Sequence, residues 1–575
     1  GFGLNSSPYS SGTYNTALGY NSLASFTTGY QNVMIGAFTG DAITTGYNNT
    51  ALGYAALSAE DTGTRNVAIG NEALKVLNYD GAGYNVAVGH RAGYALTTGT
   101  TNTFLGGFAG GATDDGTRNV AIGYAAMNTG NAGDDNIAIG YGALQDTTAS
   151  SNIAIGSSAG ISVTSGTANN LIGYYAGRYI STGEYNTMFG SETGAHMNAS
   201  SNTFIGYYAG RGSSSSSPYG NGANNVAIGR EALKAISSGS FNVAIGRDSL
   251  KIATDGDHNI ALGYSSGVAL TSGDDNVLIG KNTAINLSTG TNNIAIGENA
   301  LYLENSGTYA IAIGYRAGYK NRISGVNYNT FMGYNAGREL STGNHNTFLG
   351  NHAGYGVDGS DADNNVAIGS YSLQKIVGNN TIAIGYESGR YASGSSNTFV
   401  GYASGKGGTT SAPYSSGENN TAVGYNALGG FTTGTTNVAV GAYSLDAVTT
   451  GYANIGIGYY AGSALTTGYR NVIIGENAGD SVDDVHSLVL IGHNAGTSIN
   501  SSDAYGSVLI GAFTGDAITS GQRNTAVGRN NLSTLTTGDD NISIGDQAME
   551  THLTGLRNIA IGNNAMYNTD AGSTA

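Results

Sequence analysis

The stretch Asn49-Thr50-Ala51-Leu52-Gly53 is one copy of a five-residue motif that recurs along the entire chain. The preceding copy ends at Gly36 and the following copy at Gly70, so the motif glycines are spaced 17 positions apart here. The chain of 575 residues holds 32 such units, and 21 of the 31 intervals between their glycines have this same spacing. A fixed short period over a whole chain indicates a repeat array rather than a series of globular domains.

Each unit has the composition of a single β-coil. Position zero is the motif glycine; the β-branched residues before it favour a short strand, and the unit is too short for a helical hairpin. A second glycine follows at position +10 in 21 of the 32 units, where we expect a turn that needs a positive φ. The sequence therefore predicts an all-β fold, a parallel β-solenoid (β-roll) of about 32 coils with a 17-residue period, forming one array over residues 1–575.

Two positions of the unit exchange volume. Where position −2 is Ala, position +4 is often Leu, as in Ala51 with Leu57; where position −2 is Phe, position +4 is Gly, as in Phe104 with Gly110. Because packed interiors penalise both overpacking and cavities, we expect the two side chains to enter one slot of one coil. Some units have Ala and Gly together, and there we expect position +7 to fill the slot.

The residues on either side of position −2 are also apolar in nearly every unit, as in Val33 and Ile35. Side chains alternate along a strand, so these two point away from the coil interior. Over 32 coils they would form an apolar stripe far larger than soluble monomers tolerate. We interpret the stripe as a contact with another chain; the alternative is a flattened single-chain coil with two internal layers.

Position −4 is Asn in 28 of the 32 units. Stacked at each level, these side chains would form a structural ladder in which each amide bonds the next coil and the turn backbone. Representative ladder residues are Asn32, Asn49, Asn66, Asn102, Asn119 and Asn136.

Position +1 is Tyr in 13 units and polar or charged in many others, so it is expected to face solvent. A column of tyrosines is a candidate binding surface for a host-surface glycan or protein. The alternative is a solvated edge on which stacked rings support the sheet. The candidate binding residues are Tyr20, Tyr54, Tyr124, Tyr141, Tyr207, Tyr334, Tyr425 and Tyr459.

A longer period accompanies the short one. The three prolines, Pro8, Pro218 and Pro413, each lie 11 positions before a unit glycine, and the last two fall in the two longest intervals between glycines. We interpret residues 8–217, 218–412 and 413–575 as duplicated blocks, with lateral loops where the blocks join.

The composition excludes several classes of function. A net charge of −16 argues against nucleic acid and anionic membranes as partners, and no apolar run is long enough for membrane insertion. The absence of Cys excludes a thiolate nucleophile, a thiolate metal site and a disulfide scaffold. The chain begins with Gly rather than Met, which we interpret as processing or as a fragment of a longer protein.

No motif for catalysis, for a cofactor or for a metal stands out. The eight His residues are scattered, and no phosphate-binding loop occurs. Paired acids precede the ladder Asn at residues 134–135, 274–275 and 539–540 and could suggest Ca²⁺, but they do not lie in consecutive coils. We therefore expect no catalytic residues, no cofactor and no metal site, and we expect that the protein is not an enzyme.

The Asn-Val-Ala-Ile-Gly and Asn-Thr-Ala-Leu-Gly-Tyr units resemble the head repeats of trimeric autotransporter adhesins, and equally the arrays of phage and bacterial tail-fibre proteins. This resemblance covers essentially the whole chain and implies a left-handed parallel β-roll in a homotrimer. The period of 17 is longer than that of the usual adhesin head unit.

These observations together favour a non-enzymatic extracellular fibre protein, the shaft or head of a surface adhesin or tail fibre that mediates attachment at a cell surface or virion. Its first expected partner is itself, as a homotrimer. The alternative is a self-polymerising extracellular structural filament in which successive chains stack end to end. A glycan lyase, which would need a local cluster of acids and bases, is not supported.

Overall fold

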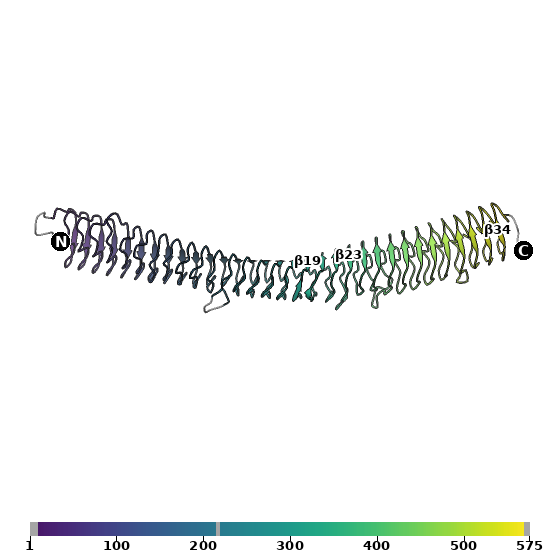
Figure 1. Cartoon of the computed structure of the whole chain (residues 1–575), viewed down its shortest axis with the longest axis horizontal. Coiled ribbons are helices and arrows are strands. Elements are labelled where there is room, and N and C mark those ends of the chain that lie inside the picture. The colour runs from purple at the N-terminus through teal and green to yellow at the C-terminus, as the bar shows by residue number, and fades with distance from the viewer. Residues whose placement is uncertain (1–9, 214–218, 552, 568–575) are drawn as a thin grey trace. The chain divides into compact units, whose positions relative to one another are not determined.

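The computed structural model describes residues 10–213, 219–551 and 553–567. The chain forms two compact units, residues 1–291 (unit 1) and 292–575 (unit 2), and each is a stack of β-coils (Figure 1). The described residues contain strands and turns but no helix. Counted over both units, 32 strands follow the repeat, so the prediction of a parallel β-solenoid with a period near 17 is confirmed.

Every strand is three residues long and comprises positions −3 to −1 of the repeat, apart from two additional strands in unit 2. The strands of unit 1 are β1 (Thr16–Leu18), β2 (Val33–Ile35), β3 (Thr50–Leu52), β4 (Val67–Ile69), β5 (Val86–Val88), β6 (Thr103–Leu105), β7 (Val120–Ile122), β8 (Ile137–Ile139), β9 (Ile153–Ile155), β10 (Asn170–Ile172), β11 (Thr187–Phe189), β12 (Thr203–Ile205), β13 (Val226–Ile228), β14 (Val243–Ile245), β15 (Ile260–Leu262) and β16 (Val277–Ile279).

Unit 2 continues the pattern. Its strands are β17 (Ile294–Ile296), β18 (Ser306–Thr308), β19 (Ile311–Ile313), β20 (Ser324–Val326), β21 (Thr330–Met332), β22 (Thr347–Leu349), β23 (Val366–Ile368), β24 (Ile382–Ile384), β25 (Thr398–Val400), β26 (Thr421–Val423), β27 (Val438–Val440), β28 (Ile455–Ile457), β29 (Val472–Ile474), β30 (Val489–Ile491), β31 (Val508–Ile510), β32 (Thr525–Val527), β33 (Ile542–Ile544) and β34 (Ile559–Ile561). The additional strands β18 and β20 pair with each other in a separate two-stranded sheet.

Successive strands pair in parallel with the repeat positions in register, so that Ala51 of β3 lies opposite Ala68 of β4. The side of the coil opposite the strands is held by backbone hydrogen bonds of the same kind, such as Leu57 N to Ala73 O at 3.0 Å. Each coil is therefore bonded to the next on more than one side, and its interior is enclosed between them.

The core of each coil is built from alternate strand residues and the turn that follows. The middle residue of the strand is fully buried, as for Ala51 and Phe104, and so is Leu57 at position +4. The residues flanking the middle one are exposed or half-buried in every repeat strand, for example Leu52. The predicted division of the strand into an inner residue and two outer ones is confirmed.

The predicted slot exchange is also confirmed. An ideal Cβ built on Gly110 would lie 2.5 Å from Cε1 of Phe104 in the same coil, and one on Gly337 would lie 2.5 Å from Cδ1 of Phe331. A leucine at position +4 therefore has no room beside a phenylalanine at position −2.

The coils that carry Ala and Gly together are filled mainly from the neighbouring coils, with position +7 contributing in one of them. A Cβ on Gly93 would meet Cδ2 of Leu74 at 2.7 Å and Cδ2 of Phe104 at 2.9 Å, and these residues belong to the preceding and following coils. At Gly93 the leucine at +4 of the preceding coil leans towards it and the phenylalanine at −2 of the following coil leans back, so this coil is filled from both sides. Position +7 contributes in another such coil, where a Cβ on Gly160 would lie 3.2 Å from Cγ2 of Val163.

The reason predicted for the glycine at position +10 is wrong. Gly46 and Gly63 are not in the left-handed region; instead, a Cβ on Gly46 would lie 2.6 Å from the carbonyl oxygen of Gly63 in the next coil. Close stacking of backbones excludes a side chain there. Positive φ angles occur at −5, +2 and +4, as at Asn48 (59°), Ala55 (52°) and Leu57 (54°), where non-glycine residues accept them.

The predicted block boundaries lie partly outside the described residues, which include neither Pro8 nor Pro218. Pro413 is described and lies in a loop between β25 and β26, within the second of the two longest intervals.

Candidate functional site

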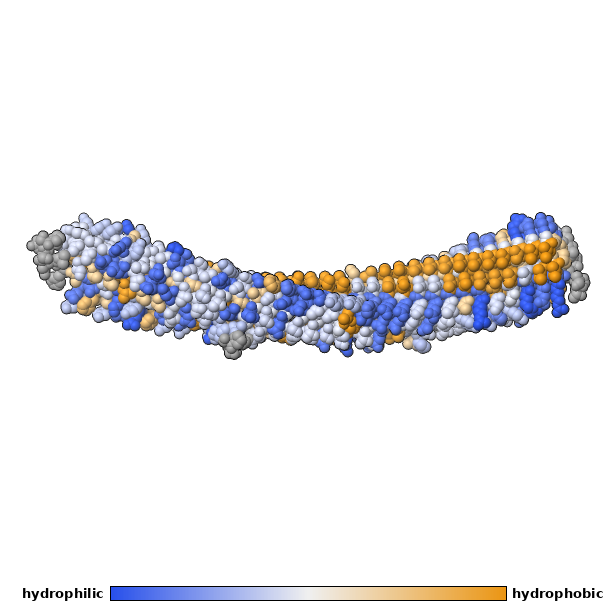
Figure 2. Space-filling model, viewed as in Figure 1, coloured by the Kyte–Doolittle hydropathy of each residue, from blue (hydrophilic) through white to orange (hydrophobic). Residues whose placement is uncertain are grey.

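The outer surface of the sheet is exposed along both units. In unit 2, 27 of the 32 residues at positions −3 and −1 are Val, Ile, Leu or Met, and the other five are Thr. Figure 2 shows these residues as two parallel hydrophobic rows along the strands of unit 2, bordered by hydrophilic side chains. Ile455 and Ile457 of β28 are 36% and 37% exposed, and Ile542 and Ile544 of β33 are 38% and 39% exposed. We call this surface the apolar sheet face.

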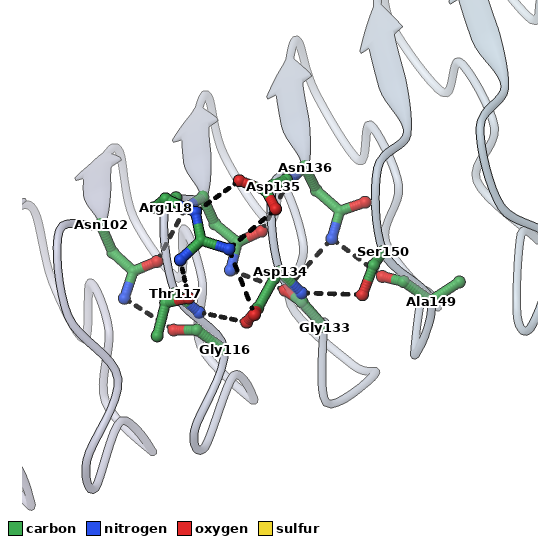
Figure 3. A network of polar contacts seen from close by, with 11 residues as sticks. Asn102, Gly116, Thr117, Arg118, Gly133, Asp134, Asp135, Asn136, Ala149 and Ser150 are labelled. Atoms are coloured by element: carbon green, nitrogen blue, oxygen red, sulfur yellow. Dashed lines mark hydrogen bonds and ion pairs between the residues drawn. The ribbon is translucent and has the colours of Figure 1, made fainter.

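The ladder of asparagines lies beneath one border of that face and is fully buried. Asn102 accepts the backbone N–H of Asn119 through Oδ1 at 2.9 Å and donates Nδ2 to the carbonyl of Gly116 at 2.8 Å (Figure 3). Gly116 is the position +10 glycine of the same repeat as Asn102, and Asn119 opens the next repeat. Each amide therefore joins the turn of its own coil to the strand start of the next coil.

The same pattern places the other ladder residues. Asn49 accepts from Asn66 N at 2.9 Å and itself donates its backbone N–H to Asn32 Oδ1 at 3.0 Å. Asn136 donates its backbone N–H to Asn119 Oδ1 at 2.9 Å and its side-chain amide to Ala149 O at 2.8 Å. The arrangement is that of a buried structural ladder with no access to solvent.

The paired acids have structural partners of their own. Asp134 accepts the backbone N–H of Thr117 in the preceding coil at 2.9 Å, and Asp135 pairs with Arg118 Nε at 2.6 Å (Figure 3). The Arg118 guanidinium lowers the pKa of Asp135. The described part of the chain contains no group of three or more His, Asp or Glu placed to hold a metal ion.

The tyrosines singled out from the sequence are exposed at the other border of the apolar sheet face. The structure exposes each of Tyr20, Tyr54, Tyr124, Tyr141, Tyr207, Tyr334, Tyr425 and Tyr459. They do not form one column, because position +1 is not aromatic in every coil. Tyr124 and Tyr141 stack with ring centroids 5.7 Å apart, whereas Tyr20 and Tyr54 are connected through the ring of Phe38.

Phe38 illustrates a row that the sequence reading missed. Position +2 also faces outward, because its left-handed conformation breaks the alternation expected of an extended strand. Together, positions +1 and +2 build an unbroken aromatic ladder over nine consecutive coils of unit 2, with neighbouring ring centroids 4.9–6.2 Å apart. Its members are Tyr315, Tyr334, His352, Tyr371, Tyr386, Tyr402, Tyr425, Tyr443 and Tyr460.

The rings of this ladder are directed mainly at one another. Tyr402 and Tyr425 are parallel within 5° at 5.0 Å, and Tyr443 and Tyr460 are parallel within 5° at 4.9 Å. Ring faces engaged in mutual stacking leave edges and hydroxyl groups for solvent. This geometry favours the sheet-supporting interpretation of the tyrosines over a platform on which sugar rings stack.

Two buried carboxyl groups were also missed. Glu60 and Glu304 occupy position +7, which is apolar in most coils, and both are fully buried. Glu60 accepts Gly63 N at 2.6 Å, and Glu304 accepts Gly307 N at 2.9 Å and Asn327 Nδ2 at 3.0 Å. Burial raises the pKa of each to about 7, against the opposing effect of these hydrogen bonds. Glu60 and Glu304 are the two acidic residues at position +7 in the sequence, and this is the signal that sets them apart.

The fold defines the class of the molecule: it is a parallel β-solenoid repeat protein. No protein-family model matches the chain, and a search of curated proteins finds no relative of significant similarity. Within the described residues there is no helix long and apolar enough to cross a membrane.

Proposed function

We propose that this chain is a non-enzymatic extracellular fibre protein, the shaft or head of a surface adhesin or tail fibre, that assembles with copies of itself as a homotrimer. The observation that carries the proposal is the apolar sheet face. A buried aliphatic side chain removes roughly 60–120 Å² from water, so side chains about one-third exposed leave on the order of 800 Å² of apolar surface on unit 2. Soluble monomers rarely expose more than a few hundred Å² in one patch.

That area matches what one partner contributes to a standard protein interface, about 800 Å². The face is continuous, regular and free of charge at positions −3 and −1, so a second copy of the same face is complementary to it. The resemblance to adhesin heads favours three copies. The chain has no thiol that an oxidising extracellular environment would attack, so its composition fits the proposed location.

The mass of the particle in solution tests this proposal. Mass photometry is expected to give three times 58.1 kDa for the full chain. The double variant Ile455→Lys/Ile457→Lys places two charges in the face and is expected to give single chains. Thr450→Lys, at an exposed corner one coil away, is the control and is expected to remain assembled. A wild-type mass of 58.1 kDa at micromolar concentration would contradict self-association, and an open ladder of masses would favour the end-to-end filament.

A further inference from the structure

A depression of about 280 Å³ lies in unit 1, across the coils on either side of the long interval between Gly206 and Gly229. Its walls include three cations, Arg211, Lys234 and Lys251, and the side chains of Ala235 and Ile252. Ile252 is 42% exposed, which leaves an apolar wall open to solvent beside the charges.

The three cations stand at the same repeat position. Arg211, Lys234 and Lys251 are each at position +5 of their unit, and this is the one place in the sequence where three consecutive units carry a cation there. Coils stack at the strand spacing, about 4.8 Å per step, so the three charges form a short ladder.

Each of these cations is paired with a carboxylate that is less exposed than the cation itself. Arg211 Nε pairs with Glu192 at 3.0 Å, and Lys251 Nζ pairs with Glu231 at 2.8 Å and with Asp248 at 3.1 Å. The side chains of Glu231 and Asp248 are only 10% and 11% exposed, whereas those of Lys234 and Lys251 are 32% and 34% exposed. The carboxylates therefore lie beneath the cations, which face the depression.

The local balance is positive in a chain of net charge −16. Arg230 and Arg247 share the same carboxylates, with Arg230 at 3.4 Å from Glu231 and Arg247 at 3.1 Å from Asp248. Five cations thus share three acids. The Lys251 and Lys234 ammonium groups lower the pKa of Glu231 to about 2, so the cluster keeps its charges over the physiological range.

The equivalent coils at the second lateral loop, in unit 2, lack this ladder. Lys406 occupies the position of Arg211 and keeps the corresponding ion pair, with Glu387 at 2.7 Å. The two following units have Gly429 and Asp446 in place of Lys234 and Lys251. The depression near that loop is lined instead by Val357, Val377, Pro413 and Tyr414. The basic ladder is therefore found at only one of the two long intervals, so the repeat sequence alone does not explain it.

We propose that the basic ladder of Arg211, Lys234 and Lys251 binds the anionic groups of an acidic polysaccharide, and that it is an attachment point of the fibre. This inference rests on the proposed function and names the class of ligand. Cations repeated at the coil spacing fit a chain with one carboxylate or sulfate per sugar, and Ala235 and Ile252 offer apolar contact to the ring C–H groups. The overall negative charge disfavours the denser charge of a nucleic acid.

Titration calorimetry on the full chain tests the proposal with three probes: heparin as a sulfated chain, polygalacturonate as a carboxylated chain and dextran as a neutral one. We expect binding of at least one acidic probe, weakened by added salt, and none of dextran. Which acidic probe binds distinguishes sulfate from carboxylate. Binding of neither acidic probe, or equal binding of dextran, would overturn the proposal.

Variants locate the site. Lys234→Gln/Lys251→Gln is expected to bind the acidic probe at least about tenfold more weakly, a change that corresponds to about 1.4 kcal/mol and needs the loss of only one charge-assisted hydrogen bond. Lys234→Arg/Lys251→Arg is expected to retain binding, and Lys406→Gln at the second loop is the matched control, expected to bind as the wild type does. Unchanged affinity of the Gln variant would place the site elsewhere.

The Lys→Gln changes also remove the ion-pair partners of Glu231 and could therefore weaken binding by disturbing the fold. A second variant tests the site without this effect. Ile252→Asp leaves every ion pair intact and adds a negative charge to the wall of the depression, so it is expected to weaken binding about tenfold as well. Mass photometry of the same samples separates this test from the proposed function. A trimer that binds no acidic probe refutes only the ligand, and a monomer that binds one refutes only the assembly.

Discussion

The coil of residues 48–64 and the coil of residues 101–117, both in unit 1, have the same length and the same backbone but fill their interiors in opposite ways. The first places Ala51 on the strand and Leu57 across from it, whereas the second places Phe104 on the strand and Gly110 across from it. Position +4 is left-handed in both, with φ of 54° at Leu57 and 62° at Gly110. The stacking of coils therefore fixes the backbone. The interior of a coil can then be filled by a large side chain at either position −2 or position +4, but not at both.

The first coil adds a second difference. Its position +7 is Glu60, a buried carboxyl group, where the other coil has Thr113. A leucine at φ of 54° also carries a steric cost of about 1–2 kcal/mol, which the burial of its side chain offsets. The comparison shows which features belong to every coil and which belong to one coil alone.

The largest expected effect comes from removing the slot filler of the second coil. Phe104→Ala is expected to lower the free energy of unfolding by about 3–5 kcal/mol, because it leaves a cavity in a close-packed interior. Gly110→Leu with Phe104 retained is expected to cost about 1–3 kcal/mol through overpacking. Urea denaturation and local hydrogen exchange measure both effects.

The double variant Phe104→Ala/Gly110→Leu gives this coil the contents of the first coil and is expected to recover part of the loss. Recovery is incomplete because Phe104 also fills the space at Gly93 in the preceding coil. Strict additivity of the two single effects would refute a shared slot.

The Asn ladder is common to both coils, so its loss is expected to cost the same in each. Asn102→Ala removes the hydrogen bonds to Asn119 N and Gly116 O in a buried setting, at a cost of about 1–3 kcal/mol. Asn49→Ala is the matched change in the first coil. A difference between the two of more than about 1 kcal/mol would show that the slot contents and the ladder are coupled.

The buried carboxyl group makes the first coil sensitive to pH. The pKa of Glu60 is raised from 4.5 to about 7 by burial, so the folded state holds the proton more tightly than the unfolded state. Its stabilising contribution is present below pH 4.5 and is lost as pH rises to about 7, a change on the order of 1–3 kcal/mol. Glu304 is expected to act in the same sense in unit 2.

Hydrogen exchange at the Gly63 amide as a function of pH measures this local change. Glu60→Gln is expected to remove the dependence, whereas Glu418→Gln, at an exposed position, leaves it in place. Protection at Gly63 that does not fall between pH 4.5 and 7 in the wild type would contradict the assignment of a neutral carboxyl group.

The smallest effect is expected at the surface. Tyr54 of the first coil is 52% exposed and makes an edge-to-face contact with Phe38, with ring centroids 5.9 Å apart. Tyr54→Ala is therefore expected to cost less than about 1 kcal/mol in thermal or urea unfolding. A cost above about 2 kcal/mol would assign the aromatic rows a larger share of the stability than their exposure suggests.

The features that recur in every coil could be predicted from the sequence alone. Because each coil must satisfy the same backbone partners and the same interior volume, the period, the strand, the volume exchange at Phe104 and Gly110, and the Asn at position −4 all leave a statistical trace over 32 units. Features confined to one or two coils, such as Glu60 and the Lys234–Lys251 pair, leave no such trace and were not found.

What only the tertiary structure decided is how neighbouring coils meet. The left-handed conformation at +2 lets the successive residues +1 and +2 both face outward, and this is what joins Tyr and His side chains of different repeat positions into one ladder in unit 2. The glycine at +10 is required by the carbonyl of the next coil and not by its own φ, and Gly93 is covered by Leu74 of the coil before it and Phe104 of the coil after it. The sequence by itself determined the content of a single coil, because that content is repeated; the contacts between coils depend on the direction in which each side chain leans, which only the stacked backbone sets.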